Sequence, residues 1–510
     1  MSPTQDKSEL AVQQIEQAAG DLKTSAVEFE RGQLLADLPD PDEGKSDEEK
    51  KAIDKKLMRK VDVWLVPWLS FLYLLSFLDR ANIGNARLAG MEKDLGMTGF
   101  QYNMSLTIFF ISYAIFEPIT NALLKRLTPR FFFTAIIVSW GVIMTLMGLV
   151  KSYEGLLVAR FFLGVAEAGL FPGVTYYLSC WYKSSEIGVR IAVFFSAAAI
   201  AGSFGGLLAA AIALMNGIGG RPGWAWIFIL EGLITVIAGI VSWWMVFDWP
   251  ETARFLDTND RIRVQRRLIL DRQGKTAEDF DRRYMFEAIK DWKTYGYAVI
   301  YMGCLVPLYA FSLFLPTIVQ GMGYTGHHAQ LLTVPPYVCA AVVTVSIGVF
   351  ADRTRWRGVC NMVTVTIGML GFALLISSSN TRIQYAGTFL GAAGIYPTIP
   401  NTLSWVSNNT EGSLKRAVVL GLVVGWGNLN GVVSSNIYLK SQRPRFWTGH
   451  GVVIGYQAVF LMGGTVFMHF ALKRENAARR AGRRNAMQDG LTEEEKAIKG
   501  DRRPDFIYTT

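Results

Sequence analysis

The chain has 510 residues, of which 51% are hydrophobic and 13% aromatic, with a mean hydropathy of +0.25 and a formal net charge of +9. These values exclude an ordinary soluble enzyme, which would be far less apolar at this length. The charge does not indicate a nucleic-acid-binding protein either, because the basic residues gather at the ends of apolar segments, where membrane topology places them. The composition therefore predicts an all-α polytopic membrane protein.

The chain begins with a polar, acid-rich segment, 1–58, that contains no apolar core. Such a segment cannot bury enough surface to fold by itself, so we expect a disordered cytosolic tail. It also lacks the apolar stretch of a cleavable signal, so the first apolar span must direct insertion.

Twelve apolar runs follow, and each is long enough to cross a bilayer core of about 30 Å as a helix of roughly 20 residues. They form two sets of six, which predicts two pseudo-symmetric six-helix bundles, 59–249 and 294–473. A cytosolic linker, 250–293, joins the bundles, and a cytosolic tail, 474–510, follows them. The predicted spans are 61–78, 105–124, 131–150, 156–178, 191–214, 224–247, 295–319, 331–350, 359–377, 383–405, 417–439 and 452–472.

The orientation follows from Lys and Arg at the flanks, since cytoplasmic segments carry the excess of these residues. Residues 50–60 hold six of them, the linker holds eleven, and residues 473–480, directly after the last span, hold four. Both termini are therefore expected in the cytosol, in a multi-pass protein of the plasma membrane that acts as a monomer.

No motif indicates catalysis, a metal or a cofactor. The "GKT" at Gly274 resembles the end of a phosphate loop, but Ile269 stands where its first glycine should be. His327 and His328 lie in a predicted outer loop and are interpreted as surface residues. The cysteines have no paired spacing and are interpreted as packing residues; they are Cys180, Cys304, Cys339 and Cys360.

Ionisable residues inside the spans are the candidates for function, because each costs at least about 2.5–3.5 kcal/mol in the bilayer unless it is paired or wetted. Arg160 and Glu167 are seven residues apart, so they share one helix face at roughly 10 Å along the axis, and a substrate carboxylate could bridge them. Asp79 and Arg80 are rotated by about 100° and must serve different partners, unless they only cap the outer end of the first helix.

Two further acids receive structural interpretations. Glu117 precedes Pro118 and is expected to hydrogen-bond backbone groups freed by the kink, although a functional role is as plausible. Glu231 is interpreted as structural.

Four stretches carry a resemblance to the major facilitator superfamily, and within it to the anion:cation symporter family, in particular its fungal branch of allantoate and nicotinate permeases. The resemblance extends from about Lys56 to Arg474. The stretches are "FLDRANIGNA" (77–86), "ARFFLGVAEAGLFPG" (159–173), "WPETARFL" (249–256) and "IYLKSQRPRFWTGH" (437–450).

The superfamily's cytosolic gate motif is also present in the second half as "GVFADRTRWRG". A charge network of this kind can hold helix ends together in one state and release them in another. The first half departs from the motif, with Asn121 and Lys125 at the glycine and aspartate positions. The gating candidates are Lys125, Arg126, Gly348, Asp352, Arg353 and Arg357.

The resemblance implies proton-coupled symport of a small organic anion, with Asp79 and Glu167 as proton carriers and Arg80 and Arg160 as their charge partners. An arginine stays charged and can fork onto a carboxylate, which suits it to attract the substrate. Competition between Glu167 and the substrate for Arg160 would link proton binding to substrate binding.

Flat aromatic and amide side chains are the candidates for the cavity wall. Tyr113, Trp405 and Asn428 are predicted to bind substrate, and Trp426 and Asn430 serve either the cavity or helix packing. A planar carboxylate such as nicotinate, or a related vitamin or nitrogen compound, would fit such a site. Two alternatives stay open, a non-transporting nutrient sensor and a uniporter of the same solute class.

Overall fold

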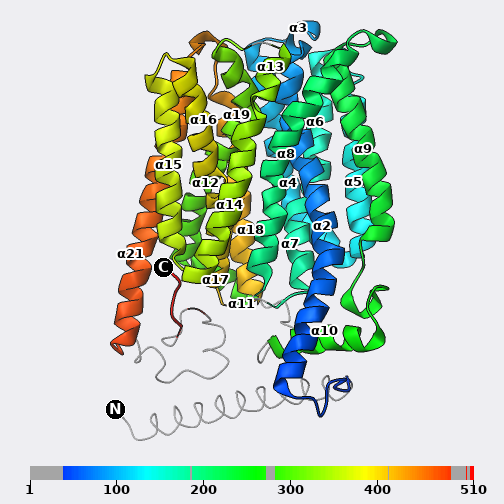
Figure 1. Cartoon of the computed structure of the whole chain (residues 1–510), viewed down its shortest axis with the longest axis vertical. Helices are drawn as coiled ribbons and strands as arrows, with labels where there is room; N and C mark the ends of the chain where they lie inside the picture. Colours follow the sequence, from blue (N-terminus) through cyan, green and yellow to red (C-terminus); the bar gives the residue numbers. More distant parts are fainter. Residues whose placement is uncertain are drawn as a thin grey trace, which may run out of the picture.

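The computed structural model describes residues 38–183, 186–271, 282–324, 326–411, 413–483, 501 and 506–510. Within these ranges every regular element is a helix, and ten helical segments are long and apolar enough to cross a membrane. The two remaining predicted spans, 105–124 and 383–405, fall in helices that run through the same bundles (Figure 1). The all-α polytopic fold predicted from the sequence is confirmed.

The first bundle begins with an exceptionally long helix, α2, that extends well beyond the predicted first span in both directions. Its start is fixed by a capping box in which Ser46 and Glu49 satisfy each other's backbone N–H groups, with acidic residues in the first turn. Residues 47–58 are therefore helical, where the sequence predicted disorder. The helices of this bundle are α2 (Asp47–Leu88), α4 (Gly99–Arg126), α5 (Pro129–Met147), α6 (Tyr153–Glu167), α7 (Leu170–Ser179), α8 (Ile187–Ile212) and α9 (Gly223–Met245).

The second bundle contains three interrupted spans. The tenth span breaks at Tyr396 and Pro397, as the two prolines predicted; Pro400 lies in the first turn of the following helix and has no N–H to donate to the Tyr396 carbonyl. Its helices are α12 (Trp292–Gly321), α14 (Val334–Thr354), α15 (Arg357–Ser377), α16 (Thr381–Ile395), α17 (Thr398–Asn408), α18 (Ser413–Leu429), α19 (Gly431–Asn436), α20 (Trp447–Gly455), η5 (Tyr456–Gly463) and α21 (Gly464–Arg480).

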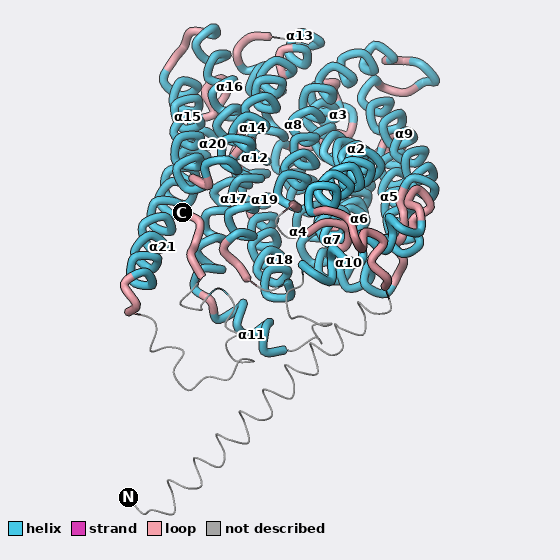
Figure 2. The backbone as a smooth tube through the Cα atoms, turned by 60° about the horizontal axis from the view of Figure 1, so that its bottom comes forward, coloured by secondary structure: helices cyan, strands magenta, loops and turns pink. Residues whose placement is uncertain are grey.

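The long helices run side by side along the longest axis of the molecule, and short helices lie at its two ends (Figure 1). We call one end the linker end; it carries α10 (Thr258–Asp271) and α11 (Arg282–Lys290) of the linker. The far end carries α3 (Met91–Asp94) and α13 (Gly326–Leu331). Figure 2 shows α15, α16, α20 and α21 on one side of the molecule and α5, α6 and α9 on the other.

Ion pairs attach the linker helix α10 to the first bundle. The Lys60 ammonium lies 3.0 Å from Asp260, and Arg267 lies 2.7 Å from Glu186. Helix α10 of the linker therefore lies against the bundle that precedes it, whereas α11 contacts α18 of the second bundle.

The two bundles contact each other between the middle of the molecule and the far end. A Cβ atom on Gly84 of α2 would lie 2.6 Å from the carbonyl oxygen of Leu313 on α12, so only glycine permits this approach. Nearer the far end, Asn436 of α19 donates a hydrogen bond to Thr107 of α4 at 2.8 Å. These contacts hold the two bundles together between the far end and the cavity described in the next section.

Candidate functional site

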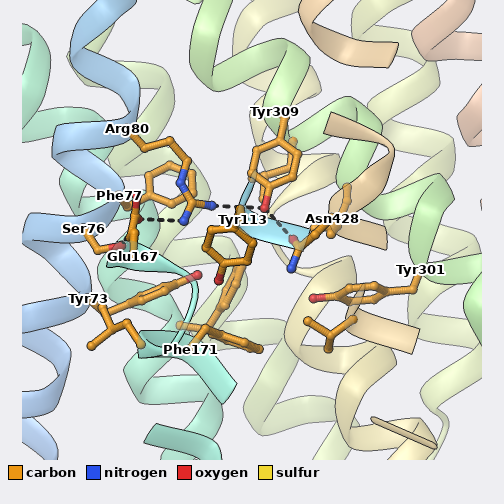
Figure 3. Close-up of a pocket in the computed structure, with 15 residues that line it drawn as sticks. Tyr73, Ser76, Phe77, Arg80, Tyr113, Glu167, Phe171, Tyr301, Tyr309 and Asn428 are labelled. Atoms are coloured by element: carbon orange, nitrogen blue, oxygen red, sulfur yellow. Dashed lines mark hydrogen bonds and ion pairs between the residues drawn. The ribbon is translucent and has the colours of Figure 1, made fainter. Parts of the chain in front are cut away.

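A small cavity lies between the two bundles and is lined by both (Figure 3). It encloses about 20 Å³, which is enough for one water molecule. The sequence predicted four of its lining residues, Arg80, Tyr113, Glu167 and Asn428. The other polar lining residues are Tyr73, Ser76, Tyr301 and Tyr309.

A buried ion pair forms the charged side of the cavity. Arg80 Nη2 donates to Glu167 Oε1 at 2.7 Å, and Ser76 Oγ donates to the same oxygen. Ser76 and Arg80 are four residues apart on α2, so one helix face presents both donors to Glu167. Glu167 is the last residue of α6, beside the break before α7. The sequence predicted that Glu167 competes with substrate for Arg160; in this conformation Glu167 is instead paired with Arg80 of the neighbouring helix α2.

Aromatic rings surround the Arg80 guanidinium. Its central carbon lies 5.2 Å from the ring centres of Phe109 and Tyr113 and 5.7 Å from that of Tyr309. Arg80 Nη1 also donates to the Tyr309 hydroxyl at 3.1 Å. The rings stabilise the cation and leave a flat apolar wall beside it.

A second buried arginine lies on the same aromatic ring. The Arg160 guanidinium is 5.9 Å from the ring centre of Phe109, and the residue is 1% exposed. Within the described part of the chain, its Nε and Nη2 atoms have no hydrogen-bond partner. Arg160 does not line the small cavity in this conformation, but it lies one ring away from Arg80.

Hydrogen bonds continue from Arg80 into the second bundle and back. The Tyr309 hydroxyl donates to Asn428 Oδ1 at 2.8 Å, and Asn428 Nδ2 donates to Glu117 Oε2 at 3.3 Å. Glu117 belongs to α4 of the first bundle and is 5% exposed. The structure thus gives the Glu117 carboxylate a partner on the opposite bundle, where the sequence predicted a bond to the backbone near Pro118.

Asp79 lies outside the cavity, in the core of the first bundle. Its Oδ2 accepts hydrogen bonds from Trp140 Nε1 at 2.8 Å and Thr235 Oγ1 at 3.0 Å. Asp79 and Arg80 therefore serve different partners, as their rotation predicted. The alternative that they cap the outer end of the helix is wrong, because α2 continues to Leu88 and Asp79 is 1% exposed. Glu231 is a neighbour in this core and accepts from Asn82.

The gate motif of the second half forms a network between α14, α15 and α17. Arg357 pairs with Asp352, and its Nη1 donates to Asn401 Oδ1 at 3.2 Å. Asn401 Nδ2 in turn donates to the Arg357 carbonyl oxygen at 2.8 Å. Arg353 is exposed and Gly348 faces open space. The side chains of Lys125 and Arg126 lie outside the described part of the structure.

The two predicted tryptophans do not reach the cavity. Trp405 donates its Nε1 hydrogen to the carbonyl oxygen of Thr509 at 2.8 Å, so it holds the C-terminal segment 506–510. Asn409 Nδ2 donates to the Thr509 carbonyl oxygen, and Asn409 Oδ1 accepts from the Thr509 N–H. Trp426 is 54% exposed on the outside of the bundle. The cavity wall uses instead Tyr301 and Tyr309, which share the predicted span 295–319 with two other tyrosines, so the sequence offered no signal that singles them out.

Two helical bundles with a charged cavity at their junction define a class of membrane transporters in which the bundles move against each other. Residues 69–435 match the model of the Major Facilitator Superfamily, and the chain belongs to this family.

The chain is similar over most of its length to fungal members of the family. It is 36% identical to the MFS-type transporter cnsO of Penicillium expansum, over 89% of this chain and 90% of the relative. It is 32% identical to the high-affinity nicotinic acid transporter of Saccharomyces cerevisiae, over 89% of this chain and 85% of the relative. A bacterial homolog of the human lysosomal transporter Spinster, in an inward-facing and unoccupied conformation, shares the fold with a TM-score of 0.59 at 15% identity, over 79% and 93% of the two chains.

Proposed function

We propose that this protein is a proton-coupled symporter of a small organic anion, working by alternating access as a monomer in the plasma membrane with both termini in the cytosol. The observation that carries the proposal is a pair of buried arginines, Arg80 and Arg160, that both lie against the Phe109 ring. Arg80 is paired with Glu167, whereas two donor atoms of Arg160 have no partner in the described residues.

The charge balance of these three residues favours an anionic substrate. Arg160 is buried and its Nε and Nη2 atoms have no partner among the described residues, and a buried charge without a partner is strongly destabilising. A substrate carboxylate supplies the missing negative charge. The free donors of Arg160 suit a carboxylate, because a guanidinium can give two parallel hydrogen bonds to its two oxygens.

Proton coupling follows from competition for one arginine. Glu167 occupies Nη2 of Arg80, so a substrate carboxylate must displace it to reach that donor. A protonated Glu167 is a weaker partner for Arg80 than the carboxylate, because charge-assisted hydrogen bonds are the stronger ones. Proton loading of Glu167 therefore favours anion binding at Arg80, and by reciprocity anion binding favours proton loading.

The shape of the site favours a planar carboxylate such as nicotinate. The rings of Phe109, Tyr113 and Tyr309 surround Arg80 and offer flat apolar surfaces beside a cation. The relative in Saccharomyces cerevisiae that is named a high-affinity nicotinic acid transporter supports this substrate class.

The transport cycle requires the cavity to open, because about 20 Å³ cannot hold an organic acid. The bundles are in contact toward the far end, so we propose that solute exchanges through the linker end in this conformation. The network of Asp352, Arg357 and Asn401 belongs to the second bundle, and we propose that it stabilises one state of the cytosolic gate.

Uptake of labelled nicotinate in cells expressing the chain tests the proposal, measured at pH 5 and pH 7.5 with allantoate, pantothenate, biotin and sugar acids as competitors. We expect faster uptake at pH 5 and competition by carboxylates only. Equal uptake at both pH values would contradict proton coupling, and failure of every acid to enter or compete would contradict the substrate class.

A further inference from the structure

Three consecutive hydrogen bonds lead from Arg80 through Tyr309 and Asn428 to Glu117, and we call them the relay. Each of them has a fixed direction. Arginine has donors only, so Arg80 Nη1 must donate to the oxygen of Tyr309. The Tyr309 hydroxyl then directs its own hydrogen to Asn428 Oδ1. This contact sets the orientation of the Asn428 amide, whose Nδ2 donates to Glu117. All three bonds therefore point from the arginine to the acid (Figure 3 shows the first two).

This relay crosses the interface between the bundles twice. Arg80 and Glu117 belong to α2 and α4 of the first bundle, while Tyr309 and Asn428 belong to α12 and α18 of the second. Asn428 and Glu117 are 311 residues apart in the chain. Any movement of one bundle against the other must change these contacts.

The surroundings of Glu117 are polar but contain no cation in direct contact with it among the described residues. The charged or titratable groups that act on its carboxylate are Arg80 on α2, Tyr113 on α4, and Tyr301 and Tyr309 on α12. Arg80 is the single permanent cation in this group. It reaches Glu117 through the relay, since hydrogen bonds in a chain polarise and strengthen one another.

We propose that Glu117 takes up a coupling proton when a substrate carboxylate binds Arg80, and that Tyr309 and Asn428 transmit the signal. This inference rests on the proposed function, in which Arg80 receives the substrate. A substrate carboxylate held by both Nη atoms of Arg80 displaces Tyr309 from Nη1 as well as Glu167 from Nη2, so the relay loses its first donor and the negative charge on Glu117 loses its support. Neutral Glu117 accepts a weaker bond from Asn428 than the carboxylate does. The contact between α4 and α18 then loosens in the loaded carrier, which allows the bundles to reorient.

The test counts protons taken up by the purified full chain when nicotinate binds, in weakly buffered solution with a pH indicator dye. We expect Glu117→Gln to take up one proton fewer per bound nicotinate than the parent. Tyr309→Phe removes one hydroxyl and keeps Glu117, and the same loss is expected because the relay is cut. Tyr385→Phe is the control, since its hydroxyl binds the Leu332 carbonyl oxygen and lies outside the cavity.

The outcomes separate the inference from the proposed function. If the parent and Glu117→Gln bind nicotinate and take up the same non-zero number of protons, the inference is wrong and the proposed function stands; if neither takes up a proton, proton coupling fails as well. Undiminished uptake in Tyr309→Phe would show that Glu117 acts without the relay and would overturn the signal path. If no organic acid binds the parent at any pH, the proposed function and the inference both fail.

Discussion

The substitution Glu167→Gln should separate proton coupling from substrate binding. Glutamine keeps the size of the side chain but removes the negative charge 2.7 Å from Arg80 Nη2. A hydrogen bond to a charged group contributes about 1.5–3 kcal/mol, and the substrate carboxylate no longer has to displace it. At 1.4 kcal/mol per factor of ten, nicotinate should bind about 10- to 150-fold more tightly at pH 7.5.

The same substitution should weaken the unliganded protein. Breaking a buried pair by removing one partner costs about 3–5 kcal/mol, because Arg80 is left as an uncompensated buried charge. We therefore expect a lower melting temperature that nicotinate restores, since a ligand that binds only the folded state stabilises it.

Binding to purified protein at pH 5 and 7.5, together with uptake and exchange in vesicles, provides the assay. Glu167→Gln should lose accumulation driven by a pH gradient and keep exchange of internal for external substrate. Glu154→Gln is the matched control, because Glu154 lies in the first turn of the same helix and is exposed. Unchanged affinity at pH 7.5, or accumulation equal to the parent at equal expression, would refute the competition between Glu167 and substrate.

Three further results are expected. Arg160→Ala should weaken nicotinate binding by roughly thirty- to several-thousand-fold, from a charged-pair loss of about 2–5 kcal/mol, with partial recovery in Arg160→Lys; unchanged affinity would make Arg160 structural. Asn409→Ala removes both hydrogen bonds to the Thr509 backbone, worth about 0.5–1.5 kcal/mol each, so hydrogen exchange at 506–510 should accelerate and the melting temperature should fall; protection equal to the parent would refute this docking. The hydrogen bond from Arg263 lowers the pKa of Asp42 from 3.8 to about 2, so its stabilising contribution is present above pH 3.8 and is lost as the pH falls through 2. Limited proteolysis of the linker should therefore proceed at the same rate at pH 7.5 and pH 5. It should be faster in Arg263→Ala, and equal rates in the parent and this variant would contradict the attachment of the linker to Asp42.

The helix breaks that position the site were only partly readable in the sequence. Pro397 marked the break in the tenth span, because proline removes a backbone donor. The break after Glu167 falls at Ala168 and Gly169, and Pro172, four residues after Ala168, has no N–H to donate to the Ala168 carbonyl; this signal was not used in predicting the span 156–178. The extension of α2 to Leu88 was also missed, since the predicted span ended with the apolar run and the later turns are buried by packing.

The two-bundle architecture could be predicted from the apolar runs alone, because in a bilayer each helix must satisfy its own backbone hydrogen bonds and must be long enough to span it. The sequence by itself also determined that Asp79 and Arg80 have different partners, since the rotation between adjacent residues is a local property of the helix. The pairing of Glu167 with Arg80 could not be predicted, because it depends on how α2 packs against the end of α6, whereas Arg160 lies two turns earlier on α6 itself. The hydrogen bonds from Tyr309 to Asn428 and from Asn428 to Glu117 join residues 119 and 311 positions apart, and such contacts depend on how two bundles meet, which no local pattern encodes.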